Sequence, residues 1–554
     1  MTDTAQTLDQ LAEEYYSAWL AVSPTEAHLL GEYQYAGGFE QATRAEEDRR
    51  VAELREFARR AQALPEEGLS EQQRITRAVI VDHATSTADL AESRLPEISA
   101  DPIFGEQTAM PLVVGMLSLP DAEVAEAMVR TFHGLGRYFG DLAERLREGA
   151  ERGRFPARFA VEATIEQIEE SLGRPAGEDP LLNTQEPPEG VDVAGWRGAL
   201  QDAIEKSVRP GLETYRDALR DVALPNARPD DKVGLCWLPG GDDAYTKALR
   251  YFTTTDKTAQ EIHDIGLAQI DKLAEEYRGL GPEVVGTDDL SEIFDAMRSD
   301  PKLHFEHADQ LVEASEVAMQ RAWEAIPNWF EVLPKAKCAV QSTLTGAKAF
   351  YFPPATDGRR GGTFFVNVKD VTAWGVFELE SLAFHEGIPG HHLQLAIASE
   401  LESVPEFRKH LHNSAYAEGW GLYSERLADE MGLYSAAVDR MGMYSADSMR
   451  ACRLVVDTGM HALGWSRQQA VDYMVANSPM TEAICRPEVD RYVVSPGQAC
   501  SYMVGRLEIQ RMRREAEQRQ GDTFDVKKFH SAVLDSGSLP LGILEEVVTA
   551  RLGQ

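Results

Sequence analysis

The sequence LAFHEGIPGHHLQLAI concentrates residues that bind metals: His385 and Glu386 are adjacent, and His391 and His392 follow shortly after. Two histidines four residues apart on a helix can share one zinc ion. A glutamate directly after the first histidine then lies beside the zinc-bound water. In this segment Pro389 occupies the position of the second histidine. The chemistry therefore depends on whether a later histidine can take its place.

The residues between the histidines predict a distorted helix. Pro389 has no backbone N–H, and the glycines at 387 and 390 allow unusual backbone angles. A regular helix would bring neither His391 nor His392 next to His385, whereas a bulge across Gly387–Gly390 returns His391 to the i+4 position. We expect His391 to be the second ligand. His392 is the alternative, and otherwise contacts the substrate or the oxyanion.

A third ligand is expected from the helix predicted at residues 413–432. A catalytic zinc ion needs three protein ligands and one open position. Glu418 is the favoured ligand because Gly419 and Gly421 follow it and would allow close approach. Glu425 is the alternative ligand, or accepts a hydrogen bond from a ligating histidine. One Zn²⁺ is expected, although two histidines and a glutamate also accept manganese or cobalt.

Helical patterns dominate the rest of the chain and predict a mainly α fold. We expect a single unit over residues 1–554, with a mainly helical half at 1–235 and the half with the metal motif at 236–554. A loop rich in proline, glycine and acidic residues interrupts the first half at 173–193. The clearest β signal is a hairpin-like pair of short strands within 348–370.

Composition excludes several classes of partner. The chain has 554 residues and a formal net charge of −36, which repels nucleic acid and anionic membranes. No run of about 18 apolar residues appears, and the acidic N-terminus lacks the pattern of an export signal. Five widely spaced cysteines without a C-x-x-C pair indicate reduced thiols. We expect a cytoplasmic protein. The sequence leaves its oligomeric state open, a homodimer included.

Four segments together resemble one bacterial family: FHEGIPGHHLQ, AYAEGWGLYSE, VDTGMHALGWSRQQA and SPGQACSYMVGR. The family is known as domain of unknown function 885 (DUF885), and the resemblance covers nearly the whole chain. It is grouped with the zincin (gluzincin) metallopeptidases and is similar to carboxypeptidase Taq, neurolysin and angiotensin-converting enzyme. The resemblance implies two helical halves that flank a deep channel, with the zinc helix at its floor and a small β element beside it.

The resemblance also implies roles for residues late in the chain. Tyr502 would donate a hydrogen bond to the oxyanion, and Tyr492 lies close before it in the sequence. Arg491 or Arg506 would bind a substrate carboxylate. His461 would be a further donor to the oxyanion or substrate.

Two more roles follow from the resemblance. Asp457 would support a ligand as a hydrogen-bond acceptor. The strand GGTFFVNV would be an edge strand on which an extended peptide pairs, with Asn367 at its end.

These residues predict metal-assisted hydrolysis of peptide bonds in short peptides, of carboxypeptidase or dipeptidase type. Zinc held by His385, His391 and Glu418 would activate water, and Glu386 would act as the general base. One alternative is a hydrolase of a small non-peptide amide or ester. The other is a peptide-binding protein that has a degenerate metal site and no catalysis.

Overall fold

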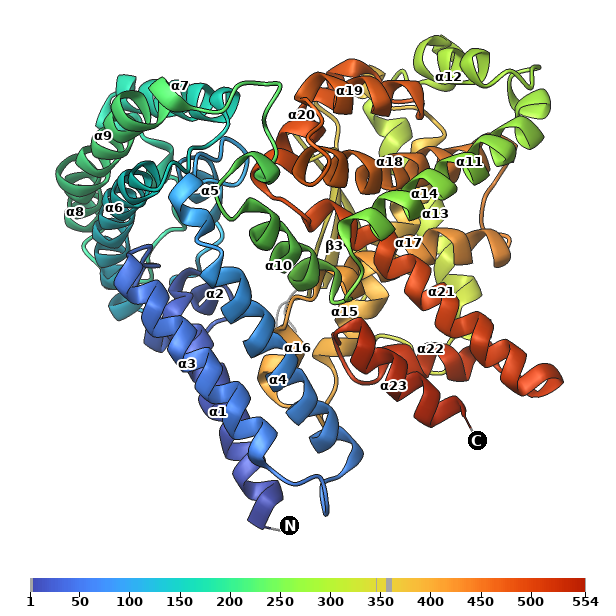
Figure 1. Cartoon of the computed structure of the whole chain (residues 1–554), viewed down its shortest axis with the longest axis horizontal. Coiled ribbons are helices and arrows are strands. Elements are labelled where there is room, and N and C mark those ends of the chain that lie inside the picture. The colour runs from blue at the N-terminus through green and yellow to red at the C-terminus, as the bar shows by residue number, and fades with distance from the viewer. Residues whose placement is uncertain (1–2, 345, 355–360, 554) are drawn as a thin grey trace.

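The computed structural model describes residues 3–344, 346–354 and 361–553. The protein is mainly helical and has one small sheet, as the sequence predicts (Figure 1). In Figure 1 the helices of the first part of the chain, blue to green, lie on the left, and those of the last part, orange to red, lie on the right. The sheet lies between them.

The first part of the chain contains long amphipathic helices with defined N-caps. Thr43 caps α3, and Ser70 begins α4 with a reciprocal capping box, so each of these N-termini has its backbone N–H groups partly satisfied. The α-helices of this part are α1 (Asp3–Val22), α2 (Pro24–Leu29), α3 (Arg44–Ala63), α4 (Glu71–Glu92), α5 (Glu106–Val113), α6 (Ala122–Glu151), α7 (Arg158–Gly173), α8 (Val193–Ala203) and α9 (Arg209–Ala218).

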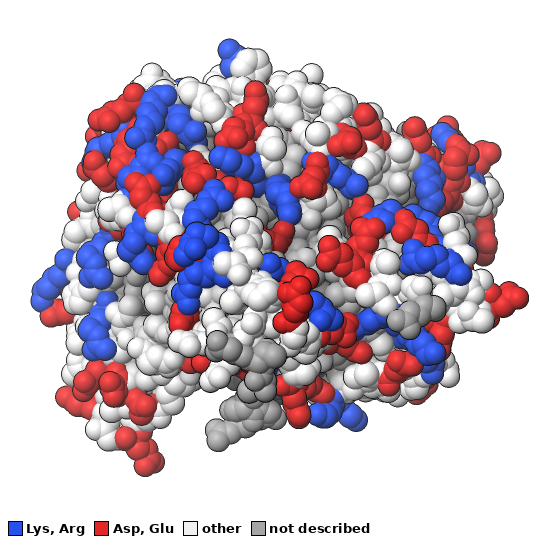
Figure 2. Space-filling model, turned by 60° about the horizontal axis from the view of Figure 1, so that its bottom comes forward, with Lys and Arg blue, Asp and Glu red and all other residues white. Residues whose placement is uncertain are grey.

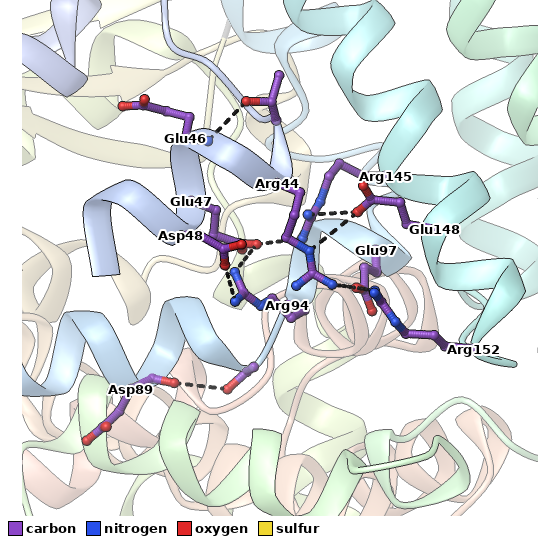
Figure 3. A network of polar contacts seen from close by, with 12 residues as sticks. Arg44, Glu46, Glu47, Asp48, Asp89, Arg94, Glu97, Arg145, Glu148 and Arg152 are labelled. Atoms are coloured by element: carbon purple, nitrogen blue, oxygen red, sulfur yellow. Dashed lines mark hydrogen bonds and ion pairs between the residues drawn. The ribbon is translucent and has the colours of Figure 1, made fainter. Parts of the chain in front are cut away.

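A network of ion pairs connects α3 and α6 to the short 3₁₀ helix η2 (Leu95–Ile98) (Figure 3). The carboxylate of Glu97 is 1% exposed and lies 3.0 Å from both Arg44 Nη2 and Arg154 Nε. Arg145, also 1% exposed, lies 2.7 Å from Glu47. Removing one partner from a buried pair leaves an uncompensated charge, so this network fixes how these helices pack.

The second part of the chain begins with α10 and carries the metal motif. Thr258 caps α11 through a capping box. The α-helices of this part are α10 (Gly241–Thr253), α11 (Ala259–Val284), α12 (Leu290–Ser299), α13 (Ala308–Ala325), α14 (Glu378–Glu386), α15 (His391–Ser399), α16 (Glu406–His410), α17 (Ser414–Glu430), α18 (Ala437–His461), α19 (Arg467–Ala476), α20 (Glu482–Val494), α21 (Ser501–Gln520), α22 (Val526–Leu534) and α23 (Leu541–Leu552).

The sheet has three strands in the order β1-β3-β2: β1 (Cys338–Thr343), β2 (Ala349–Phe352) and β3 (Gly362–Asn367). The antiparallel pairing of β2 with β3 confirms the predicted pair of strands, although residues 355–360 of the connecting loop lie outside the described residues.

The prediction that GGTFFVNV is an edge strand was wrong. β3 is the central strand, because β1 pairs with it in parallel on the other side. The strand β1 was not predicted, since its sequence CAVQST has little apolar character and its residues are at most half buried. The two edges of the sheet therefore belong to β1 and β2.

Both parts of the chain contribute to one continuous hydrophobic core. The rings of Tyr15 in α1 and Phe407 in α16 pack edge to face with centroids 5.4 Å apart. Near the middle of the chain, Gly234 approaches α18 so closely that a Cβ atom would lie 1.7 Å from the carbonyl oxygen of Met460. These contacts fix the position of the metal motif relative to the first part of the chain.

Acidic and basic side chains are interspersed over the molecular face in Figure 2, despite the large negative net charge. All five cysteines are free thiols, as predicted. Among the described residues, no helix combines the length and apolar character needed to cross a membrane.

Candidate metal centre

The predicted distortion occurs, and it breaks the helix completely. α14 ends at Glu386, and α15 begins at His391. Between them Gly387 and Gly390 adopt ψ angles of −116° and −129°. A Cβ atom at Gly390 would lie 1.9 Å from the carbonyl oxygen of His385, so only glycine allows this turn. The turn brings His391 back toward His385.

The helix α17 holds the turn in place. The indole N–H of Trp420 donates to the carbonyl oxygen of Pro389 at 2.9 Å, and the hydroxyl of Ser424 donates to the same oxygen at 3.2 Å. All three groups are buried, so these hydrogen bonds are shielded from water. Because α17 also carries Glu418, one helix positions both the turn and the third predicted ligand.

The structure brings together the three side chains favoured as ligands. One potential ligand atom from each of His385, His391 and Glu418 lies within 4.8 Å of the other two. Glu418 Oε2 is 3.5 Å from Nε2 of His385 and 3.6 Å from Nε2 of His391. Donor atoms on a tetrahedral zinc ion lie about 3.3–3.5 Å apart, given bonds of about 2.0–2.2 Å. The observed separations therefore fit a single small cation.

Glu425 acts as the hydrogen-bond partner of His385 and is not in the ligand cluster. Its carboxylate is fully buried, accepts from Nδ1 of His385 at 2.8 Å and accepts from the Ser381 hydroxyl at 2.7 Å. This is the second role anticipated for Glu425 from the sequence. The contact fixes the tautomer of His385 so that Nε2 faces Glu418 and can bind a metal.

The cluster has the electrostatic character of a cation site. Burial opposes protonation of His385, but the hydrogen bonds that it donates to Glu418 and Glu425, with Glu386 nearby, raise its pKa to about 9. Burial would raise the pKa of Glu418, yet the two neighbouring imidazoles, His385 and His391, hold it well below its ordinary value. The carboxylates around His385 and His391 therefore stabilise a positive charge at this cluster.

Two glycines in α17 create the space that the cluster needs. A Cβ atom at Gly421 would lie 2.6 Å from Cε1 of His385, too close to the imidazole ring for the ring to keep its position. A Cβ atom at Gly419 would lie 2.5 Å from the backbone of Gly505 in α21. The first glycine admits the ligand and the second lets α21 pack closely, as the small residues around Glu418 suggested.

Glu386 is the last residue of α14 and is partly exposed. Its negative charge acts on two neighbours: it favours protonation of His385 and, together with burial, raises the pKa of Cys338 to about 12. The Glu386 carboxylate therefore lies near the ligand cluster and near the first residue of β1.

Tyr502, in the first turn of α21, lies beside the cluster. Burial and the nearby Glu418 carboxylate both raise the pKa of its phenol, which keeps the hydroxyl protonated and able to donate. The guanidinium carbon of Arg453 lies 4.5 Å from the centre of the Tyr502 ring, a cation–π contact that holds the ring. Tyr502 keeps partial exposure to solvent.

The structure does not bring His392 into the cluster. Its Nδ1 is 2.8 Å from the hydroxyl of Tyr351 in β2, and its Nε2 is 3.0 Å from the carbonyl oxygen of Ala336. With both ring nitrogens in hydrogen bonds, His392 connects α15 to the sheet and has no free nitrogen for a metal or an oxyanion. Burial lowers its pKa to about 4, so it stays neutral.

His461 is likewise committed elsewhere. It is fully buried, Nδ1 accepts from the backbone N–H of Leu235 at 3.1 Å, and Nε2 donates to the carbonyl oxygen of Tyr492 at 2.9 Å. The ring joins α18 and α20 to the segment before α10. Its role is structural, because neither nitrogen remains for a substrate.

Three of the four predicted substrate contacts also serve the fold. Arg506 Nη1 donates to the buried carboxylate of Asp447 at 2.6 Å. The fully buried Tyr492 hydroxyl accepts from Arg453 Nε at 2.9 Å. Asn367 donates to the carbonyl oxygen of Gly346 at 3.0 Å and joins the end of β3 to the segment before β2.

Arg491 keeps partial exposure, with 12% of its side chain accessible. Asp457 does not support a ligand, because its carboxylate binds the Tyr245 hydroxyl at 2.5 Å and the backbone N–H of Gly497 at 3.1 Å. Sequence reasoning missed Arg453, although an arginine within the apolar segment CRLVV of α18 is itself a sign of a buried charge.

Comparison with known proteins gives a family and a fold. Residues 24–548 match the family described as "Bacterial protein of unknown function (DUF885)", so the chain belongs to this family. The comparison with curated proteins gives no match.

Two solved structures show the fold. The first is a "putative lipoprotein" from Colwellia psychrerythraea, 23% identical, with a TM-score of 0.91 and full coverage of both chains. The second is a "putative lipoprotein of unknown function" from Shewanella oneidensis, 19% identical, with a TM-score of 0.78. The match covers 97% of this chain and 99% of that chain.

Proposed function

We propose that this DUF885 protein is a zinc-dependent hydrolase of peptide bonds in short peptides, of carboxypeptidase or dipeptidase type. The observation that carries the proposal is the convergence of His385, His391 and Glu418 at separations that suit one zinc ion. Glu425 orients the first histidine, as in many zinc sites. The proposal includes the zincin-like arrangement, in which two helical halves flank a channel.

Each group has a defined part in the proposed reaction. A bound zinc ion supplies Lewis acidity, which polarises the substrate carbonyl and acidifies water. Glu386 accepts a proton from that water through its carboxylate and returns the proton to the leaving amine. The Tyr502 hydroxyl donates a hydrogen bond to the carbonyl oxygen as negative charge develops there. Glu425 holds the proton on Nδ1 of His385, so that Nε2 stays available as a ligand.

The strand β1 gives the substrate a place to bind. It is an edge strand of the sheet, and its first residue, Cys338, lies near Glu386. An extended peptide can pair with an edge strand through backbone hydrogen bonds, which bind main chain without selecting side chains. A peptide along β1 would pass close to the general base.

The proposal is tested by metal analysis and by a library of dipeptides, tripeptides and acyl-amino acids. The wild-type protein should retain about one zinc ion per chain and hydrolyse members of the library. Glu386→Gln should keep the zinc and lose about 10²- to 10⁴-fold in rate, since it removes the general base. Glu430→Gln is the matched control, because Glu430 lies on the surface of α17 and pairs with Arg513.

Three results would count against this function. If the protein binds no divalent metal, His385, His391 and Glu418 do not form a metal site. A Glu386→Gln variant with wild-type activity would exclude the assigned base. Zinc-loaded protein that hydrolyses no library member would favour a peptide-binding protein, and cleavage of acyl-amino acids alone would favour a hydrolase of non-peptide amides.

The cellular location is a separate proposal. The widely spaced cysteines without a C-x-x-C pair favour a cytoplasmic protein. The two similar solved structures carry the name lipoprotein, and on that basis an exported, lipid-anchored location is the alternative. Cell fractionation and metabolic labelling with a fatty-acid probe distinguish the two locations.

A further inference from the structure

A cavity of about 230 Å³ lies where the first part of the chain meets the end of α20. Its walls come from residues 95–101 and 156–160 of the first part, from residues 493–496, and from Arg228 and Leu235 between them in the sequence. The volume is below the range of about 300–1,000 Å³ that is typical for drug-sized ligands, so the cavity suits a smaller molecule.

Arg228 gives this mostly apolar cavity a positive charge. Among the described residues that line the cavity, only Ser99, Asp101 and Arg228 have polar side chains. Arg228 is 8% exposed, and the charged groups that act on it are Cys236 and Arg154, neither of which is a carboxylate. Burial lowers its pKa to about 10, so the guanidinium stays protonated at neutral pH. A buried charge without a counter-ion is costly, and an anion in the cavity would offset that cost.

Backbone carbonyl groups hold the Arg228 guanidinium and leave one nitrogen free. Nε donates to the carbonyl oxygen of Phe155 at 2.8 Å, and Nη1 donates to those of Val233 and Gly234 at 2.5 Å each. A β-bridge to Ala157 fixes the backbone of Arg228. Nη2 has no hydrogen-bond partner among the described residues and keeps accessible surface. Because Arg228 lines the cavity, Nη2 is the atom that an anion there would reach.

The Asp101 carboxylate, which also lines the cavity, is engaged by its own loop. Its Oδ1 accepts from the backbone N–H groups of Ile103 and Phe104 at 2.8 Å each. In the described part of the chain Asp101 forms no ion pair with Arg228, so the charge of the guanidinium is not cancelled. The Ser99 hydroxyl on the same wall can supply a second donor to a bound anion.

We propose that this cavity binds a small organic acid, with its carboxylate at Arg228 and its apolar body against the surrounding walls. One uncompensated guanidinium matches one carboxylate, and the apolar walls favour an aliphatic body over an inorganic anion. A short aliphatic acid and a free apolar amino acid share this chemistry. None of the proposed metal ligands lines the cavity, so the site is separate from the metal centre and does not depend on the hydrolase function.

The test compares 4-methylpentanoate with its neutral amide by ligand-observed NMR titration of the full-length protein. We expect the acid to bind about 10- to 100-fold more tightly than the amide, the range for a hydrogen bond to a charged group. Leucine has the same apolar body and carboxylate with an added ammonium group. Tighter binding of leucine would identify an amino acid as the ligand, and tighter binding of 4-methylpentanoate would identify a simple acid; both results support the site.

Two substitutions locate the binding site. Arg228→Gln should remove the preference for the acid over the amide, and Arg228→Lys should retain part of it because the charge remains. Val494→Phe tests the site without changing the arginine: Val494 is partly exposed, and the larger ring should fill the cavity and weaken binding of the acid at least about 10-fold. Circular dichroism checks that each variant is folded.

Val317→Phe is the matched control, because Val317 is 54% exposed on α13 and does not line the cavity. It should bind the acid like the wild-type protein. Equal affinity for the acid and the amide, or binding of neither acid, would overturn the site. Unchanged binding by folded Val494→Phe would place the acid elsewhere and refute the assignment. Inorganic phosphate that binds as tightly as 4-methylpentanoate would refute the role of the apolar walls.

Discussion

Glu425→Gln is the substitution that best separates an organised metal centre from a chance cluster. Glu425 has no exposed surface and touches the site only through His385, whose Nδ1 lies 2.8 Å from its carboxylate. Glutamine has nearly the same shape and keeps one acceptor oxygen. The substitution therefore removes the negative charge that supports His385 while preserving the packing around it.

The expected size of the effect follows from these contacts. Replacing a carboxylate that orients a zinc-ligating histidine typically weakens metal binding by about 10- to 100-fold. This corresponds to about 1.4–2.7 kcal/mol at 25 °C. The Ser381 hydroxyl donates to Glu425 at 2.7 Å and can rotate to suit either the oxygen or the nitrogen of glutamine. The change at this hydrogen bond therefore adds little to the loss of zinc affinity.

Competition with a chromophoric chelator measures the zinc affinity of the wild-type protein, of Glu425→Gln and of a control, Glu430→Gln. Glu430 belongs to the same helix but is half exposed and pairs with Arg513, so its substitution should leave zinc affinity unchanged. Circular dichroism checks that all three proteins are folded. If folded Glu425→Gln binds zinc as tightly as the wild-type protein, the assignment of His385 as an oriented ligand is refuted.

Three further predictions concern the surroundings of the site. Gly421→Ala should abolish zinc binding in titrations, because the added Cβ would lie 2.6 Å from the His385 ring. The control Gly198→Ala, which has open space around it, should bind zinc like the wild-type protein. If the two variants bind zinc with equal affinity, the close approach of Gly421 to His385 is contradicted. Tyr502→Phe should lower kcat by about 10²- to 10³-fold with unchanged zinc content, and an unchanged kcat would exclude it as the oxyanion donor. Burial raises the pKa of Asp457 to about 7, so the native state holds a proton that the unfolded chain releases above about pH 4. The free energy of unfolding should therefore fall by up to about 1.4 kcal/mol per pH unit between about pH 4 and 7. Denaturant titrations at several pH values should show that this free energy depends less on pH in Asp457→Asn. A pH dependence equal to that of the wild-type protein would contradict the shifted pKa.

Local sequence was sufficient for the features that depend on neighbours along the chain. The helical class, the cap at Thr258 and the paired strands around 349–367 follow from periodicity and capping residues. The break between α14 and α15 was predictable as well, since Gly387, Pro389 and Gly390 limit the backbone wherever they occur. The choice of His391 followed from that break, and the choice of Glu418 followed from the small residues Gly419 and Gly421 after it.

The sequence could not show which polar side chains are already engaged by distant partners. His461 looks like a donor in the sequence, but backbone groups of Leu235 and Tyr492 occupy both its nitrogens. Arg506 looks like a carboxylate binder, but it binds Asp447, 59 residues away. Pairing over such separations depends on how whole helices pack, and residue type alone does not encode it.

The sequence by itself determined the chemistry available to this protein: two imidazoles on either side of a helix break that realigns one of them, and a carboxylate on a later helix. Tertiary structure decided which groups converge. It assigned Glu425 to orient His385, made β1 the edge strand and left Arg491 accessible beside Tyr502. The physical reason is that ligand types and turn residues act over a few positions of the chain, whereas burial and hydrogen-bond satisfaction are settled only when distant elements pack together.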